Sequence, residues 1–236
     1  MPKKIYYLVL DVETANSTED ALVYDLGYAI VDRAGAVYEA DSFIVSDIFY
    51  DECELMQSAY YAEKIPQYLE GIKAKAFKVR NFYQVRKLLK EAMARWNCSI
   101  VCAYNAHFDV TALNTTERYL TKSKYRYFLP YGTEVFCIWN MACQVICTQT
   151  GYIKFCLANN FVSPSGNIKT SAEAVYAFLT KNANYAECHT GLQDVLIESK
   201  IMAECFRKHK KMEKNINRFC WRIPQAKAKE IKKELG

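Results

Sequence analysis

Long apolar runs are missing from this chain of 236 residues. A helix that crosses a membrane needs about 18 consecutive apolar residues, and no stretch approaches that length. The apolar segment near the start, Ile5–Leu10, is too short for the core of a secretory signal and ends at Asp11. From these absences we expect a cytoplasmic protein without a membrane partner.

Paired cysteines of the CxxC type are also missing, although the chain has 10 cysteines. The closest spacings, Cys98-x3-Cys102 and Cys143-x3-Cys147, correspond to one step along a helix or strand rather than to zinc-ligand pairs. Without a secretory signal, a disulfide framework is not expected. We therefore predict that most cysteines are small buried side chains. A structural zinc site is the alternative.

Aspartate becomes scarce after Asp51. Only Asp109 and Asp194 follow it, although glutamates continue throughout the chain. This pattern indicates that the two positions require the shorter carboxylate.

The composition is that of a soluble globular protein, with 51% hydrophobic and 24% charged residues. Its charge is uneven. Residues 207–236 contain eleven Lys/Arg and three Glu, a net charge of +8, which leaves −3 for the preceding 206 residues. We predict one domain over residues 1–206 and a basic tail over residues 207–236. The tail either contacts nucleic-acid phosphates or is a solvated helix docked on the body by Phe219 and Trp221.

One stretch, residues 189–194, has the pattern of a helix start. Thr190 is a good N-cap, and Gln193 three residues later completes a capping-box pattern. His189 and Asp194 then occupy the two positions whose side chains normally meet as a hydrophobic staple. Both side chains are polar here, which indicates a functional pair at the start of a helix through Phe206.

Two further carboxylates follow the first predicted strand. Side chains alternate along a strand, so Asp11 and Glu13 project from one face while Val12 points to the core. Two like charges on one face repel each other, and a divalent cation would relieve this repulsion. A solvated strand end is the alternative.

Asp109 lies where a short buried strand, Ser99–Ala103, passes into a helix predicted over Val110–Leu120. Ligand sites of open α/β sheets gather at such junctions, and a helix start favours a carboxylate. The alternative is that Asp109 is only the N-cap of this helix.

The element order predicts an α/β fold. Strands at residues 5–10, 22–31 and 36–45 form an antiparallel start, with a hairpin turn at Asp32–Gly35. Residues 51–80 are predicted helical, with breaks around Pro66 and Gly71. Strands at 99–103 and 135–138 then alternate with helices. Further helices are predicted over residues 81–96, 141–146, 172–180, 195–206 and 226–235. This order implies a mixed sheet flanked by helices.

The three motifs, in this order, resemble those of the DEDD superfamily of 3′→5′ exonucleases. They are Asp11-x-Glu13, Asn105-x-x-Phe108-Asp109 and His189-x4-Asp194. The histidine places the resemblance in the DEDDh branch, with the proofreading epsilon subunit of DNA polymerase III, RNase T and oligoribonuclease. It spans roughly residues 5 to 206 and implies a ribonuclease H-like fold.

The resemblance implies a two-metal phosphodiesterase that uses two Mg²⁺ or Mn²⁺ ions. Asp11 would bridge the ions, Glu13 and Asp194 would complete one site, and Asp109 would hold the other. His189 would be the general base that takes a proton from the attacking water.

The resemblance also implies substrate contacts by Thr14, beside the 3′ end, and by Asn105 and Phe108. Two positions depart from the pattern. Asn16 replaces a glycine found in many relatives, and Asn140 stands where relatives often carry aspartate. These departures bear on the sugar contact and on an accessory contact, but the catalytic set is complete.

The favoured function is a 3′→5′ exonuclease that releases nucleoside monophosphates from single-stranded or frayed DNA. An exoribonuclease acting on RNA or short oligoribonucleotides has the same motifs. A non-catalytic nucleic-acid-binding module is the alternative from another class, although the complete carboxylate set argues against it. Since no polymerase segment is visible in the sequence, a proofreading role would need a polymerase or another replication partner.

Overall fold

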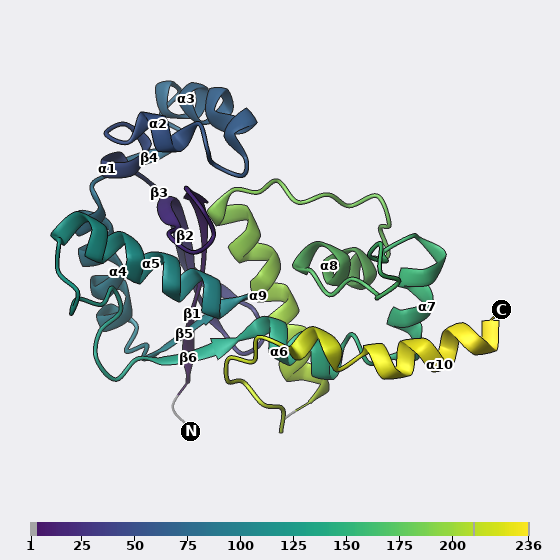
Figure 1. The fold of residues 1–236 in the computed structure, drawn as a ribbon. Helices are drawn as coiled ribbons and strands as arrows, with labels where there is room; N and C mark the ends of the chain where they lie inside the picture. Colours follow the sequence, from purple (N-terminus) through teal and green to yellow (C-terminus); the bar gives the residue numbers. More distant parts are fainter. Residues whose placement is uncertain (1–3, 210, 236) are drawn as a thin grey trace.

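The computed structural model describes residues 4–209 and 211–235 (Figure 1). Residues 1–3, Lys210 and Gly236, which belong to the predicted domain and tail, lie outside the described residues. A mixed six-stranded sheet runs through the centre in the order β4-β3-β2-β1-β5-β6. Its strands are β1 Tyr6–Ala15, β2 Leu22–Asp32, β3 Val37–Val45, β4 Lys78–Arg80, β5 Ile100–Ala103 and β6 Glu134–Cys137.

The first three strands pair antiparallel, whereas β5 is parallel to β1, β6 to β5, and β4 to β3. The helices are α1 Ser46–Phe49, α2 Cys53–Met56, α3 Ile65–Lys73, α4 Phe82–Arg95, α5 Ala106–Thr121, α6 Ile138–Val145, α7 Thr150–Ala158, α8 Ala172–Thr180, α9 Gly191–Lys208 and α10 Gln225–Leu235. Short 3-10 helices are η1 Ala62–Lys64 and η2 Cys220–Arg222. The predicted α/β class is confirmed.

The sheet separates two apolar cores, and the alternation of β1 divides its side chains between them. Leu8 and Leu10 join the core beneath α4 and α5, whereas Tyr7 and Val9 join the core beneath α6 and α9. Figure 1 shows α4 and α5 on one side of the sheet and α6 to α9 on the other. By the same alternation, Asp11 and Glu13 face the α9 side.

Several element boundaries differ from the prediction. Helix α5 begins at Ala106 rather than Val110, because Asn105 and not Asp109 is its N-cap. Pro66 lies in the first turn of α3, where its missing N–H has no helical partner to lose, and Gly71 lies inside the same helix. The three-residue strand β4 and the helix α7 were not predicted.

The hairpin prediction is confirmed. Gly35 has a φ of +80°, and the Asp32 carboxylate accepts hydrogen bonds from the N–H groups of Ala34 and Ala36. Of the cysteines, eight are buried and two are exposed, Cys53 and Cys188, and all are free thiols. The prediction that most are small buried side chains is therefore confirmed. None of the helices in the described residues is long and apolar enough to span a membrane.

The predicted tail packs on the body. Cys220, Ala228 and Ile231 are buried, and Gln225 exchanges hydrogen bonds with the backbone of Ile168. The Cys137 N–H donates to the carbonyl of Lys214 at 2.7 Å, at the end of β6. Figure 1 shows α10, in yellow, passing the end of α7, with which it is in contact. The described tail residues therefore contribute to the core rather than only to the surface charge.

Candidate active site

The predicted motifs meet in one cavity of about 510 Å³ at the end of β1. Strand β1, the start of α5 and the start of α9 supply the polar side chains, and α6, α8 and the loop before η1 complete the wall. The lining includes the five predicted catalytic residues, Asp11, Glu13, Asp109, His189 and Asp194.

Strand β1 brings Asp11 and Glu13 into the cavity from the same face, as its alternation predicted. The pairing of β1 with β2 shifts register between Glu13 and Thr14, where Tyr24 is the extra residue on β2, so the bulge lies opposite the end of the second carboxylate's strand segment. Bulges of this kind re-aim side chains near active sites.

Helix α9 approaches β1 and β2 closely because two glycines face each other. A Cβ atom on Gly191 would lie 2.5 Å from the Gly27 nitrogen and 3.3 Å from the Asp11 carbonyl oxygen. A Cβ atom on Gly27 would lie 2.1 Å from the Gly191 carbonyl carbon. The absence of both side chains lets the start of α9 lie against the strands, which places Asp194 beside Glu13.

The predicted capping box at Thr190 is wrong, although Thr190 is the N-cap. Its side chain makes no capping hydrogen bond. Instead the buried carboxylate of Asp25, on β2, accepts from the Gly191 N–H at 3.2 Å and from the Tyr68 hydroxyl at 2.8 Å. A residue more than 160 positions away therefore caps the first turn of α9.

Asp109 and Asp194 occupy equivalent positions in their helices. Each is the fourth residue, of α5 and of α9 respectively, and each is almost fully buried, with 4% and 7% exposed. The positive end of a helix dipole favours a carboxylate in the first turn. The scarcity of aspartate in the second half of the chain thus coincides with two similarly placed carboxylates in one cavity.

The carboxylates raise one another's pKa in the absence of a cation. Burial raises the pKa of Glu13 to about 9, and the charge of Asp194 adds to this. Burial likewise raises the pKa of Asp109 to about 7 and that of Asp194 to about 6. The pKa of Asp11 is raised well above its ordinary value, first by burial and then by Glu198 and Asp109. So many buried acids without matching cations are costly to ionise.

His189 lines the same cavity as these acidic residues and has a left-handed backbone conformation, with a φ of +49°. Its ring stacks on Tyr61 with centroids 4.3 Å apart, and the Tyr61 hydroxyl lies 3.3 Å from Nε2. Burial and the charge of Lys64 lower the pKa of His189. The imidazole is therefore neutral near pH 7 and able to accept a proton. His189 and Asp194 lie close together, with ligand atoms of Glu13, His189 and Asp194 within 4.8 Å of one another, although no hydrogen bond or ion pair joins the two among the described residues.

The sequence reasoning missed four residues around this group. Glu198 lies one turn after Asp194 on α9, is 4% exposed and accepts a hydrogen bond from the Tyr104 N–H. Glu187 also lines the cavity, and its Oε2 lies 3.9 Å from Nδ1 of His189. Asp25 and Tyr61 complete the set. Only Glu198 had a sequence signal, because residues four apart share one helix face.

Of the predicted substrate-binding residues, two line the cavity and one does not. Asn105 and Phe108 line the cavity. Thr14 is half-buried after the bulge and is not among the cavity-lining residues. Asn16 has a φ of +72°, a conformation that asparagine adopts more readily than other residues with a side chain. Asn140 is buried away from the cavity and donates to the Asn215 carbonyl.

These residues fit a divalent cation. The buried Oδ1 of Asp194 has no hydrogen-bond partner among the described residues. Carboxylate oxygens of Glu13 and Asp194 converge on one volume with an imidazole nitrogen. Hard oxygen donors of this kind suit Mg²⁺ or Mn²⁺. The cluster contains no cysteine, so the alternative of a thiolate zinc site gains no support.

Comparison with known proteins identifies structural relatives only. No protein-family model matches the sequence, and no curated protein is similar to it in sequence. Exonuclease I from Methylocaldum szegediense, which is moderately thermophilic, superposes with a TM-score of 0.55 at 14% identity, over 88% of this chain and 41% of that one. E. coli exonuclease I with a 5cy-dT13 oligonucleotide gives 0.53 at 13% identity, over 89% and 44%.

The chain has a ribonuclease H-like fold. A product-bound exonuclease I agrees, with a TM-score of 0.52 at 12% identity over 88% of this chain and 44% of that one. The chain thus spans well under half the length of these exonucleases.

Proposed function

We propose that this chain is a metal-dependent 3′→5′ exonuclease of the DEDDh type, which hydrolyses single-stranded or frayed DNA to nucleoside monophosphates. One observation carries the proposal. Asp11, Glu13, Asp109 and Asp194, from three separate elements, share a cavity with a neutral histidine on a ribonuclease H-like fold. The oligonucleotides bound to E. coli exonuclease I make single-stranded DNA the first substrate to test.

The four aspartate and glutamate side chains would hold two divalent ions, which when bound stabilise the attacking and leaving oxygens of phosphodiester hydrolysis. Burial of these carboxylates excludes water and strengthens their electrostatic interactions. His189 takes the proton of the attacking water, because its pKa is lowered and its side chain is open to the cavity. Asn105 and Phe108, at the start of α5, would contact the terminal nucleotide.

The testing experiment follows strands labelled at the 3′ or the 5′ end, made of DNA or RNA, with Mg²⁺, Mn²⁺ or EDTA. We expect immediate release of the 3′ label as a mononucleotide, stepwise shortening of the 5′-labelled DNA, and no reaction in EDTA. Faster digestion of RNA would favour the exoribonuclease. Internal cuts, loss from the 5′ end, or cleavage that persists in EDTA would contradict the proposal. Asp109→Asn is the inactive control.

A further inference from the structure

The loop between α5 and β6, residues 122–133, presents tyrosines to solvent. Tyr125 is 89% exposed, and Tyr127 and Tyr131 are also exposed. Tyr83, on the adjacent helix α4, is 73% exposed. This loop and the helix that it contacts thus expose four large rings, which is uncommon unless such a region binds something.

The loop backbone is firmly held, so the exposure is not that of a frayed segment. Arg86, on α4, donates to the carbonyls of Tyr127 and Phe128 at 2.6 and 2.9 Å and pairs with Glu117 at 2.9 Å. The Phe128 N–H donates to the Asn114 side chain, and the Phe128 ring is buried against Phe82. The tyrosines are thus displayed by an anchored loop.

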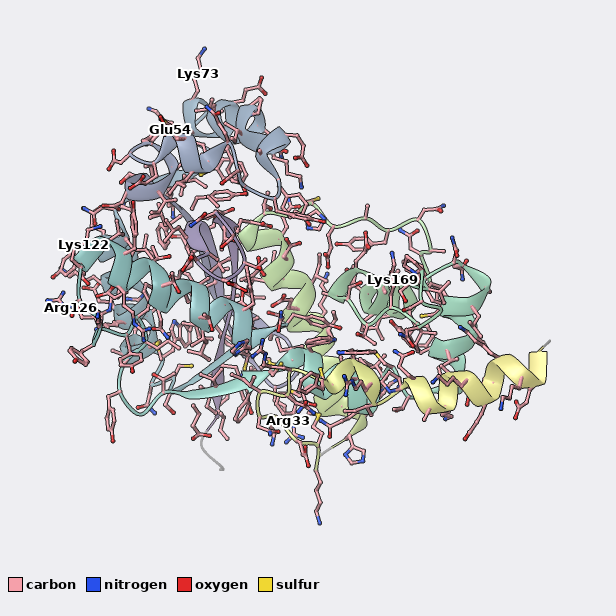
Figure 2. All side chains as sticks on the ribbon, viewed as in Figure 1. Arg33, Glu54, Lys73, Lys122, Arg126 and Lys169 are labelled. Atoms are coloured by element: carbon pink, nitrogen blue, oxygen red, sulfur yellow. The ribbon has the colours of Figure 1, made fainter. Side chains whose placement is uncertain are left out.

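The same surface is strongly basic. Residues 118–132 contain four cations, Arg118, Lys122, Lys124 and Arg126, and no acidic residue. The nearest acid on α5, Glu117, is buried and already neutralised by Arg86. Figure 2 shows Lys122 and Arg126 projecting outward at the edge of the molecule. Exposed rings interleaved with cations are the composition of a single-stranded nucleic-acid surface, where cations meet phosphates and rings stack on bases.

Helix α5 connects this loop to the candidate active site. It begins beside the cavity, ends at Lys122, and its 16 residues span about 24 Å at 1.5 Å each. One face carries His107, Thr111, Thr115, Arg118 and Lys122, at spacings of three and four residues, and changes from neutral to basic along its length. Both acids of α5, Asp109 and Glu117, are buried, so neither would repel a strand along this face.

We propose that the surface formed by Tyr83, Lys122, Lys124, Tyr125, Arg126 and Tyr131, the tyrosine-loop surface, binds a single-stranded nucleic acid upstream of its 3′ end. The inference rests on the proposed function, which places that end in the cavity. At the roughly 3.4 Å rise of a duplex strand the length of α5 corresponds to about seven nucleotides, and an extended single strand needs fewer. The surface therefore contributes to the binding of long strands and not to the binding of the shortest ones.

The test measures affinity for oligo-dT of about 2 and about 20 nucleotides against salt, with EDTA present so that strands stay intact. Lys124→Glu with Arg126→Glu should weaken binding of the long strand and lower its slope against log salt by about 0.7 per lost phosphate contact. Tyr125→Ala with Tyr131→Ala should weaken it at least about fivefold per lost stack. The short strand should bind the variants and the wild type equally.

Two matched controls separate local from general effects. Lys154→Glu with Lys169→Glu makes the same change of charge on the exposed surface of the α7–α8 region, and Tyr125→Phe with Tyr131→Phe keeps both rings. Both controls should bind the long strand as the wild type does. Folded loop variants with wild-type affinity and salt slope would overturn the proposal.

The two proposals fail separately. A protein that binds long strands through this loop but hydrolyses none would contradict the proposed exonuclease activity and would still support the proposed binding surface. A protein that digests strands while its loop variants bind normally would contradict only the proposed binding surface.

Discussion

His189 is the residue on which proton transfer would depend. It lies before α9 in a left-handed conformation, which costs an ordinary L-residue roughly 1–2 kcal/mol, and its ring is fixed by stacking on Tyr61. Such a cost is tolerated when the surroundings determine the position, as at functional sites.

Replacement of His189 by alanine should reduce turnover roughly 10²–10⁴-fold, the contribution of a positioned general base. Metal binding should survive, because four carboxylates remain. The comparison is His209→Ala, an exposed histidine at the end of α9. Steady-state rates of both variants on a labelled strand test this, and wild-type turnover in His189→Ala would place the base elsewhere.

We expect the Asp194 carboxylate to be required for activity and, in the metal-free protein, to lower stability. Asp194→Asn should abolish hydrolysis, because it removes a proposed metal ligand. It should also raise the stability of the metal-free protein near pH 8, by on the order of 1–3 kcal/mol, because a buried charge repelled by its neighbours disappears. Asp11→Asn and Asp109→Asn should likewise lose activity.

Activity assays and thermal unfolding in EDTA measure the two effects. Asp51→Asn, at an exposed position, is the matched control and should change neither. An Asp194→Asn protein that keeps full activity would remove Asp194 from the metal set.

At the scale of elements, the contact between the start of α9 and the strands decides whether the site assembles. Gly191→Ala would place a Cβ atom 2.5 Å from backbone on β2, which cannot move as a side-chain tip could. We expect a loss of about 1–3 kcal/mol, or roughly 2–4 °C per kcal/mol in Tm, together with reduced hydrolysis as Asp194 is displaced.

The control for this substitution is Gly151→Ala in α7. There the nearest atom to an added Cβ is 3.9 Å away, and alanine favours a helix over glycine. Thermal unfolding should therefore show no loss for Gly151→Ala. Equal Tm values for Gly191→Ala and the wild type would mean that the close approach of α9 and β2 is not needed.

For the whole molecule, the acidic cavity predicts how stability depends on pH and metal. The pKa values of Glu13, Asp109 and Asp194 are about 9, 7 and 6 when folded, above those of the unfolded chain. The folded state then binds more protons than the unfolded state, so these groups stabilise it at low pH and progressively lose that contribution as pH rises from about 4 to 9.

Mg²⁺ should offset this loss, because it binds the ionised carboxylates of the folded state. The difference in Tm between Mg²⁺ and EDTA should therefore grow between pH 6 and 9. Differential scanning fluorimetry across this range measures it. The same series on Asp109→Asn should show a smaller rise, whereas a pH-independent difference in the wild type would argue against metal binding by these groups.

The sequence by itself determined most of the framework. Alternation in β1 predicted that Asp11 and Glu13 share a face, and apolar periodicity located α4, because both signals depend on neighbours a few residues apart. The spacing of His189 and Asp194 predicted that they lie close together for the same reason. The start of α5 and the capping partner at the start of α9 were less well predicted, since capping depends on partners outside the local sequence.

Only the tertiary structure decided what surrounds those residues. Asp25 caps α9 across more than 160 residues, and the facing pair Gly27 and Gly191 sets how closely α9 approaches the sheet. Stacking of Tyr61 on His189 joins the loop before η1 to the loop before α9, and the tail residues that looked like a basic appendage bury Ala228 and Ile231 in the core. Each of these contacts joins segments far apart in the chain, so no local pattern encodes it, and only the packing of the completed sheet and helices brings the partners within reach.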